Sequence, residues 1–376
     1  MQNKKITILL LAVIVSIVYF TAPDFRTDAA SSENRDDLPV NIILFIGDGM
    51  GVPHITAAKT VMGRLQMERF DLCGLVTTHP YGSFITDSAA SGTAMATGYK
   101  TMNGMISQSP DQKRLKTVLE YAEEMNKSTG IVVTSSVTHA TPTVFIAHVD
   151  DRNKNNEIAE QIVDSGIDIL FGGGLAYFIP CSREGSKRDD EKDLLKILGE
   201  RLDIALTAEE FRSLSDSGYA AAFIALRHPG KVSEREISLA EMTEKAVRIL
   251  SKDPDGFFLM VEGSQIDWEG HDNNLDGIIG ETVDFDNAVG VGMDFAESDG
   301  RTLVLVTSDH ETGGFAVHGG STENRTISSA SFTTGGHTGS MVPLFAFGPG
   351  AGLFGGIHDN TFIGKTMVEL LTYQKR

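Results

Sequence analysis

The chain has 376 residues, 41% of them hydrophobic, which is enough to bury a large core as one big domain or two. Its 51 acidic residues outnumber 32 basic ones, and a net charge of −19 argues against general binding to nucleic acid or to an anionic membrane, because both need a basic face. An anionic substrate would therefore need local positive charge from metal ions or from a well-placed arginine.

The N-terminus has the pattern of an export signal. Lys4 and Lys5 precede an apolar run of 15 residues over 6–20, and small residues follow it. The run is short for a membrane span, and an uncleaved anchor is the alternative interpretation. We expect residues 1–30 to be a signal peptide, 31–38 a disordered linker and 39–376 one folded domain that acts in the periplasm or outside the cell.

Short apolar runs alternate with longer helical patterns after residue 40. This alternation predicts an α/β fold, a three-layer sandwich in which helices flank a large, mostly parallel central sheet. The expected strands cover 41–46, 130–134, 257–261, 302–307 and 342–347. The expected helices cover 115–125, 157–164, 239–250, 278–295 and 362–371. In such sheets ligands bind at the carboxyl ends of the strands, where loops converge.

Residues 86–98 are almost all Ala, Gly, Ser or Thr, which predicts a helix that packs very closely against its neighbours. Ser88 lies at its expected start, where unpaired N–H groups favour a developing anion. It could become a nucleophile if something nearby lowered its pKa. Taken alone, a serine that only caps the helix is the simpler interpretation.

Three expected strands end in residue types that bind metals. Asp48 follows the first strand, Glu262 follows the third, and Asp309 with His310 follows the fourth. An acidic residue after a strand often only forms a turn or caps a helix, so each one alone is weak. Together with two loops that carry histidine, they predict a functional site at one edge of the sheet.

A second pattern follows Glu262 closely. Asp267 and His271 are four residues apart, which places them on the same side of a helical turn. Carboxylate and imidazole are ligands that zinc accepts, and His337 could supply a third. Alternatively Asp267 caps a helix and His271 is a surface ring, because short metal motifs also arise by chance.

The chain has two cysteines, Cys73 at the start of an apolar run that suggests a buried strand and Cys181 in a loop rich in Gly and Ser. An exported chain could join them, but one pair does not make a disulfide framework. We expect two free thiols.

Six segments taken together closely resemble the alkaline phosphatase family, which are metal-dependent phosphomonoesterases with a serine nucleophile. They are Gly-Asp-Gly-Met-Gly (47–51), Thr-Asp-Ser-Ala-Ala-Ser-Gly-Thr-Ala (86–94), Thr-His-Ala-Thr-Pro (138–142), Val-Glu-Gly-Ser-Gln-Ile-Asp-Trp-Glu-Gly-His (261–271), Thr-Ser-Asp-His-Glu-Thr-Gly-Gly (307–314) and Gly-Gly-His-Thr (335–338). The resemblance runs from about residue 41 to the C-terminus. It implies that residues 39–376 are a single catalytic domain with the fold of that family.

The resemblance also implies a role for each matched position. Ser88, beside Asp87, would become phosphorylated, and Arg152 would hold the phosphate. Of two zinc ions, one would bind Asp267, His271 and His337, and the other Asp48, Asp309 and His310 together with Ser88. One magnesium ion would bind Asp48, Thr141 and Glu262. Some family members carry Asp and Lys where this chain has His139 and Trp268, so the coordination of the magnesium stays open, with His139 in contact directly or through water.

The implied function is that of an exported alkaline phosphatase, which hydrolyses phosphate monoesters to an alcohol and inorganic phosphate through a phosphoserine. The resemblance suggests a homodimer, and we expect no specific nucleic-acid partner and no stable membrane partner. The alternatives are a phosphodiesterase or another phosphoryl or sulfuryl hydrolase of the same superfamily, and a zinc- or phosphate-binding protein without turnover. His318 is a candidate for lining the site. We expect structural roles in core or surface for the histidines at 54, 79, 148, 228 and 358.

Overall fold

The computed structural model describes residues 38–373, and all of them belong to one unit of the chain. The expected signal peptide and residues 31–37 of the expected linker lie outside this range. Within it, none of the helices combines the length and the apolar character that crossing a membrane requires.

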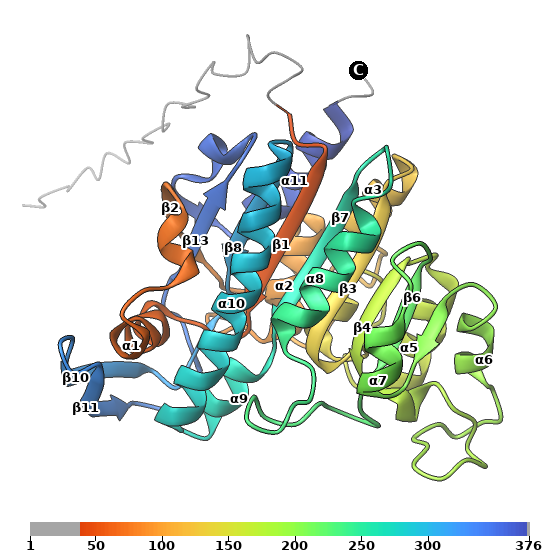
Figure 1. Ribbon diagram of the computed structural model, residues 1–376, viewed down its shortest axis with the longest axis horizontal. Helices are drawn as coiled ribbons and strands as arrows, with labels where there is room; N and C mark the ends of the chain where they lie inside the picture. The colour runs from red at the N-terminus through yellow and green to blue at the C-terminus, as the bar shows by residue number, and fades with distance from the viewer. Residues whose placement is uncertain (1–37, 374–376) are drawn as a thin grey trace, which may run out of the picture. The chain divides into compact units, whose positions relative to one another are not determined.

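A ten-stranded sheet forms the centre of the fold, in the order β14-β2-β13-β8-β1-β7-β3-β4-β6-β5 (Figure 1). Its strands are β1 (Asn41–Gly47), β2 (Leu72–Thr77), β3 (Ser128–Ser136), β4 (Ile169–Gly173), β5 (Asp203–Ala205), β6 (Ala220–Phe223), β7 (Phe257–Gly263), β8 (Thr302–Thr307), β13 (Val342–Phe347) and β14 (Gly356–Asp359). In this sheet only β13 is antiparallel to its neighbours, β8 and β2. The expected large and mostly parallel sheet is confirmed.

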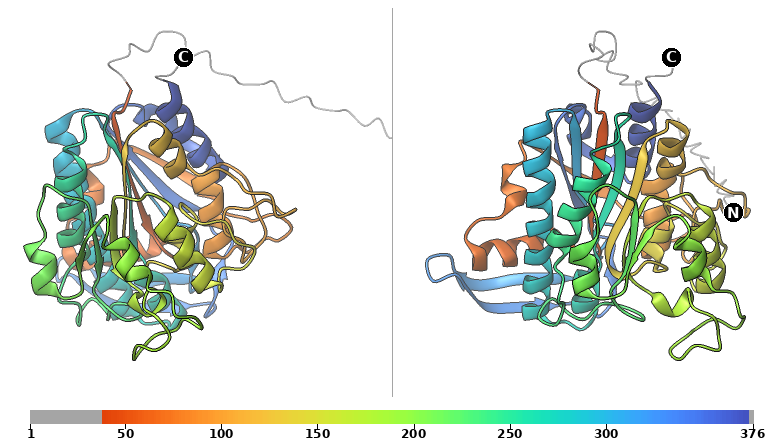
Figure 2. Two further views of the ribbon diagram at one scale, coloured as in Figure 1. Left: turned by 90° about the vertical axis from the view of Figure 1, so that its right-hand side faces the viewer. Right: turned by 45° about the vertical axis from the view of Figure 1, so that its right-hand side comes forward.

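Helices cover both faces of the sheet (Figure 2). They are α1 (Val52–Met62), α2 (Ser88–Thr97), α3 (Val118–Glu124), α4 (Ala140–Thr143), α5 (Asn155–Asp164), α6 (Leu194–Leu198), α7 (Ala208–Ser213), α8 (Leu239–Leu250), α9 (Gln265–His271), α10 (Leu275–Asp299) and α11 (Thr361–Thr372). Short 3-10 helices lie at Gln66–Arg69, Leu175–Tyr177 and Ala351–Phe354.

The alternation of side chains along β1 divides the core in two. Ile42 and Leu44 pack in one cluster with α2, α3, α5 and α11, whereas Ile43 and Phe45 pack in the other with α8 and α10. Successive side chains of a strand point to opposite faces, so a central strand between two helical layers must be apolar throughout. This explains why every residue of β1, β7 and β8 is buried.

Some boundaries differ from those expected. The helix expected over 115–125 is shorter, because Thr117 caps α3 by accepting a hydrogen bond from the backbone N–H of Glu120, whose side chain accepts one from Thr117 N–H in return. The strands β4, β5, β6 and β14 were not among those expected. Cys73 does lie in a strand, β2, but that edge region leaves its side chain exposed, not buried; both cysteines are free.

Two small sheets complete the fold. The hairpin of β10 (Phe315–Ser321) and β11 (Thr326–Phe332) extends from the lower left of Figure 1. A two-residue pairing joins β9 (Glu311–Thr312) to β12 (His337–Thr338), with Thr312 opposite His337. The second pairing matters for function, because it holds His337 beside the loop that follows β8.

Helix α2 packs unusually closely against α11. All ten residues of α2 are buried, and a Cβ atom added at Gly364 of α11 would lie 2.5 Å from the backbone nitrogen of Gly98 and 2.7 Å from the carbonyl oxygen of Met95. Small side chains allow this approach, as the composition of residues 86–98 predicts. The contact fixes α2, and with it Ser88 at the first helical position.

We predict that Gly364→Ala destabilises the protein, although alanine is normally favoured over glycine inside a helix by about 1 kcal/mol. The added methyl group collides with backbone atoms of α2, and overpacking of this kind costs roughly 1–3 kcal/mol. Chemical unfolding measures the change. Gly352→Ala is the matched control, since nothing lies within 4 Å of its added Cβ. A Gly364→Ala protein as stable as its parent would contradict the close packing.

Candidate active site

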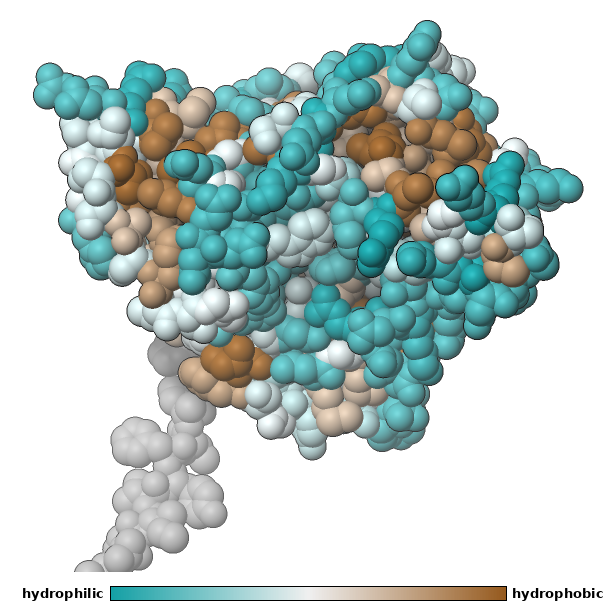
Figure 3. All heavy atoms as spheres, turned by 90° about the horizontal axis from the view of Figure 1, so that it is seen from below, coloured by the Kyte–Doolittle hydropathy of each residue, from teal (hydrophilic) through white to brown (hydrophobic). Residues whose placement is uncertain are grey.

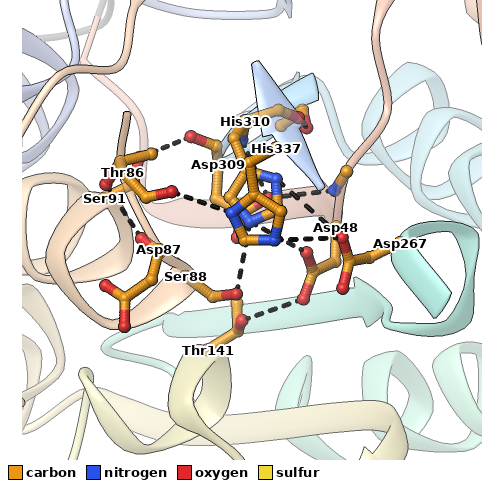
Figure 4. A network of polar contacts seen from close by, with 12 residues as sticks. Asp48, Thr86, Asp87, Ser88, Ser91, Thr141, Asp267, Asp309, His310 and His337 are labelled. Carbon is orange, nitrogen blue, oxygen red and sulfur yellow. Dashed lines mark hydrogen bonds and ion pairs between the residues drawn. The ribbon is translucent and has the colours of Figure 1, made fainter. Parts of the chain in front are cut away.

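Three neighbouring strands of the sheet bring the expected ligand-type residues together. Asp48 follows β1, Glu262 lies in β7, and Asp309 with His310 follows β8. Ile46 of β1 is in register with Glu262 on one side and with Thr307 on the other. The side chains therefore meet at the carboxyl edge of β8, β1 and β7, as Figure 4 shows for those it labels.

The first group of side chains surrounds the imidazole of His310. Its Nε2 atom lies 3.2 Å from Asp309 Oδ2, 3.5 Å from Asp48 Oδ1 and 3.3 Å from Ser88 Oγ. These side chains are buried, and Asp48, Asp309 and His310 form a group with spacing that could hold a metal ion.

The second group consists of Asp267, His271 and His337, which also could hold a metal ion. His271 Nε2 lies 3.4 Å from Asp267 Oδ2, and His337 Nε2 lies 3.5 Å from Asp267 Oδ1. Helix α9 supplies the first two residues on one face, as their spacing predicts. The rings of His310 and His337 stack with centroids 3.5 Å apart, so the two groups are adjacent.

Each of these three histidines is oriented through its other ring nitrogen. His271 Nδ1 lies 2.7 Å from the carbonyl oxygen of Gly335, and His337 Nδ1 lies 2.8 Å from that of Thr86. His310 Nδ1 contacts the hydroxyl oxygen of Thr312, and this hydroxyl donates to Asp267. A carbonyl can only accept, and the Thr312 hydroxyl already donates to Asp267, so Nδ1 carries a proton in each ring and Nε2 is the nitrogen left to bind a metal.

A third group lies deeper and consists of Asp48, Glu262 and His139. Thr141 joins it, because its hydroxyl donates to Asp48 Oδ2 at 3.3 Å. His139 is the residue at the N-cap of α4, and Thr141 lies inside this short helix with its hydroxyl directed at Asp48.

The buried carboxylates lack the partners that negative charge requires. Asp48 Oδ1, Asp309 Oδ2 and both oxygens of Glu262 accept no hydrogen bond of ordinary geometry from the described part of the chain. Burial, together with the neighbouring carboxylates, raises the pKa of Asp48 well above its usual value, and burial raises that of Glu262 to about 8. A divalent cation would satisfy these oxygens and keep both groups ionised, so the donor set fits a metal.

Ser88 is held at the N-terminus of α2, but it is not the cap. Asp87 caps this helix, since its Oδ1 atom accepts a hydrogen bond from Ala90 N at 2.9 Å. The Oδ2 atom of Asp87 accepts from Arg152 Nη1 at 3.1 Å, and Arg152 Nη2 lies 3.3 Å from His139 Nε2. The two contacts orient the guanidinium beside Asp87, the residue that precedes Ser88, and leave other N–H groups of Arg152 for an anion.

Sequence reasoning missed one neighbour of the site, His228. Its ring packs edge to face against two other rings. The ring centroids lie 4.8 Å apart for His228 and Trp268 and 6.1 Å apart for His228 and His139. His228 follows β6, a strand that the sequence did not predict, so nothing placed this loop at the carboxyl edge of the sheet. Its Nδ1 atom accepts a hydrogen bond from Ser136 N at 3.0 Å, which anchors the loop to β3.

The other histidines lie outside these three groups. His318 is exposed on the β10–β11 hairpin, where its Nε2 atom contacts the hydroxyl of Ser331. His54 is buried against Phe315, and this burial lowers its pKa to about 4. A packed, neutral ring of this kind is a structural residue.

Comparison with known proteins gives matches over most of the chain. The sequence matches the family model described as "Alkaline phosphatase" over residues 40–326, a range that contains every site side chain above except His337. It is 33% identical to alkaline phosphatase 3 of Bacillus subtilis over 96% of this chain and 96% of that protein. It is also 33% identical to streptomycin-6-phosphate phosphatase of Streptomyces griseus, over 94% of this chain and 95% of that one.

A solved structure has the same fold. It is a variant of an alkaline phosphatase named TAB5, after an Antarctic bacterium, with Mg bound in its M3 site. The TM-score is 0.83 and the sequence identity 38%, over 89% of this chain and 98% of that chain.

We predict that Thr312→Val weakens metal binding, with zinc as the probe, by about 10–100-fold, because His310 and Asp267 lose the hydroxyl that orients them both. Titration of zinc into chelator-treated protein measures the affinity. Thr312→Ser keeps the hydroxyl and should bind zinc like the parent. Equal affinities for the valine variant and the parent would show that Thr312 does not orient the ligands.

Proposed function

This chain belongs to the alkaline phosphatase family, and we propose that it hydrolyses phosphate monoesters to an alcohol and inorganic phosphate with Ser88 as the nucleophile. The observation that carries the proposal is the position of Ser88 Oγ, 3.3 Å from His310 Nε2 and at the edge of a group of buried carboxylates and imidazoles that fits a metal. The name of the Streptomyces relative, a phosphatase of a monoester, supports the substrate class.

The three groups of side chains would hold three cations. We assign one zinc to Asp267, His271 and His337, and a second to Asp48, Asp309 and His310, because carboxylate with imidazole is a zinc ligand set. Asp48, Thr141 and Glu262 would hold magnesium, which prefers oxygen ligands, and His139 lies close enough to take part. The Mg in the related TAB5 variant supports this assignment.

The bound cations would supply positive charge for the phosphoryl oxygens and lower the pKa of the Ser88 hydroxyl. The chain itself adds the N-terminus of α2, where Ser88 is the first residue and where the helix dipole favours negative charge. Because both effects act on the same oxygen, the hydroxyl of Ser88 would lose its proton more easily than that of a serine on the surface.

Arg152 would hold the phosphate. Asp87 and His139 each accept one hydrogen bond from the guanidinium. These bonds fix the plane of the guanidinium and leave further N–H groups to bind two non-bridging oxygens of the ester. Burial of the imidazole and the charge of Arg152 lower the pKa of His139 to about 3. The ring is therefore neutral at physiological pH and accepts a hydrogen bond from Arg152. A lysine could not make the paired contact.

The reaction then takes two displacements at phosphorus. In the first, the bond from Ser88 Oγ to phosphorus forms while the ester bond to the leaving oxygen breaks, and the alcohol departs with a proton. In the second, water attacks the phosphoserine, releases inorganic phosphate and returns the proton to Ser88 Oγ. A covalent intermediate speeds hydrolysis because it replaces one slow step by two steps with lower barriers.

We predict that Ser88→Ala lowers the turnover of an aryl phosphate by roughly a thousandfold or more, because the attacking oxygen is gone. Steady-state assay of purified, zinc- and magnesium-loaded protein measures the loss. Ser298→Ala, at an exposed serine near the end of α10, is the control and should keep full activity.

Two further measurements support the interpretation of this variant. Metal analysis should find the same zinc and magnesium content in Ser88→Ala as in the parent, so that lost activity reflects the nucleophile. EDTA should inactivate the parent, and zinc with magnesium should restore it. Near-normal turnover by Ser88→Ala would refute the proposal, and faster hydrolysis of a diester than of a monoester would favour the related phosphodiesterases.

We also propose that the protein is exported and acts as a homodimer. The charged and apolar pattern of residues 1–20 supports export, and family membership supports the dimer. Light scattering is expected to give twice the mass of one chain, and a fully active monomer would exclude the dimer. Fractionation of the producing cells should find the activity outside the cytoplasm.

A further inference from the structure

The group of Asp267, His271 and His337 is the most open to solvent of the three. The side chain of His271 is 39% exposed and that of His337 is 15% exposed, whereas those of Asp48, Asp309 and His310 are completely buried. The side of the site at His271 and His337 is therefore open to the organic part of a bound ester, whereas the side at Asp48, Asp309 and His310 is closed.

Residues 81–87 form a wall next to this open side. The carbonyl oxygen of Thr86 accepts the hydrogen bond from His337 Nδ1. Asn103 holds the same segment on its other side, because its Nδ2 donates to Ile85 O at 3.0 Å and its Oδ1 accepts from Asp87 N at 3.1 Å. The segment is thus fixed to His337, a candidate metal ligand, on one side and to Asn103 on the other.

This wall carries exposed apolar side chains. Phe84 is 73% exposed, and Tyr81, Ile85 and Met102 are also exposed; we call these four residues the Phe84 surface. Tyr81 N donates to Thr101 O at 2.8 Å, which places Met102 on the segment next to it. Seen from the carboxyl edge of the strands, apolar side chains gather in separate patches on a mostly polar face (Figure 3). Exposed apolar patches of this kind mark binding sites.

The ring of Phe84 has a defined place close to His337. A Cβ atom added at Gly339, two residues after His337, would lie 2.3 Å from Phe84 Cε1. The absence of a side chain at 339 therefore makes room for the ring over the backbone that continues from His337. An aromatic ring at this place lies on the His337 side of the site, next to the backbone of Gly339.

We propose that the Phe84 surface is a subsite for an apolar, aromatic leaving group of the substrate, with Phe84 as the main contact. This inference rests on the proposed function, since it assigns the alcohol half of the ester to the His271–His337 side of the site. Phe84 would pack edge or face against an aryl group, and it would add nothing to the binding of a phosphate without one. Phe84 thereby determines specificity and does not take part in the chemistry.

Binding of two inert phosphonates tests this. Phenylphosphonate and methylphosphonate carry the same anionic group, and their P–C bond resists hydrolysis. Calorimetry on zinc- and magnesium-loaded protein should show that Phe84→Ala lowers the affinity for phenylphosphonate by roughly three- to tenfold, which is the usual contribution of one aromatic contact. The affinity for methylphosphonate should change by less than about twofold. Phe84→Tyr keeps the ring and should bind both like the parent.

Three results would overturn the subsite: an unchanged affinity for phenylphosphonate in Phe84→Ala, an equal loss for both phosphonates, or a loss that Phe84→Tyr does not restore. If affinity stays unchanged while light scattering shows that Phe84→Ala alters the oligomeric state, a second copy of the chain covers the surface instead. Tyr373→Ala, at an exposed tyrosine after α11, controls for the loss of any surface ring. Failure of the parent to hydrolyse any monoester would refute the proposed function, but not the selectivity measured by binding.

Discussion

Burial of several carboxylates at the carboxyl edge of three adjacent strands is the constraint on which the site depends. Asp48, Glu262 and Asp309 lie in a dry region with oxygens that no described protein group satisfies. Mutual repulsion and burial would keep Asp48 and Glu262 protonated without a cation. A bound cation would supply the positive charge that Asp48 and Glu262 lack, and the histidines whose Nδ1 atoms are held by oxygen acceptors have their Nε2 atoms left to bind it.

The second constraint is the close packing that fixes Ser88. Helix α2 has almost no large side chains, so α11 can approach its backbone at Gly364 and hold it without a gap. The Ser91 hydroxyl then donates to the carbonyl oxygen of Asp309 at 2.6 Å and joins the start of α2 to the loop after β8. Ser88 and the group of Asp48, Asp309 and His310 are thereby held in one packed structure, so no rearrangement is needed to bring them together.

The fold could be predicted in its centre and less well at its edges. The strands over 302–307 and 342–347 and the helix over 239–250 match the structure residue for residue, because long apolar runs and strong amphipathic periodicity leave few alternatives. The short strands β5, β6 and β14 were missed, since three or four residues carry too little pattern. Because β6 was not predicted, the position of the loop that carries His228, beside His139 and Trp268, could not be predicted either.

The sequence by itself determined which residues are chemically able to form a metal-dependent site, because residue type and spacing within one segment are local properties. Asp267 and His271 share a face of α9 for this reason. Only the tertiary structure decided how segments far apart in the chain meet. It stacks His337 on His310 through the pairing of β9 with β12, turns Thr141 toward Asp48, and places Phe84 over Gly339. Such contacts depend on strand order and on packing between layers, neither of which any single stretch of sequence encodes.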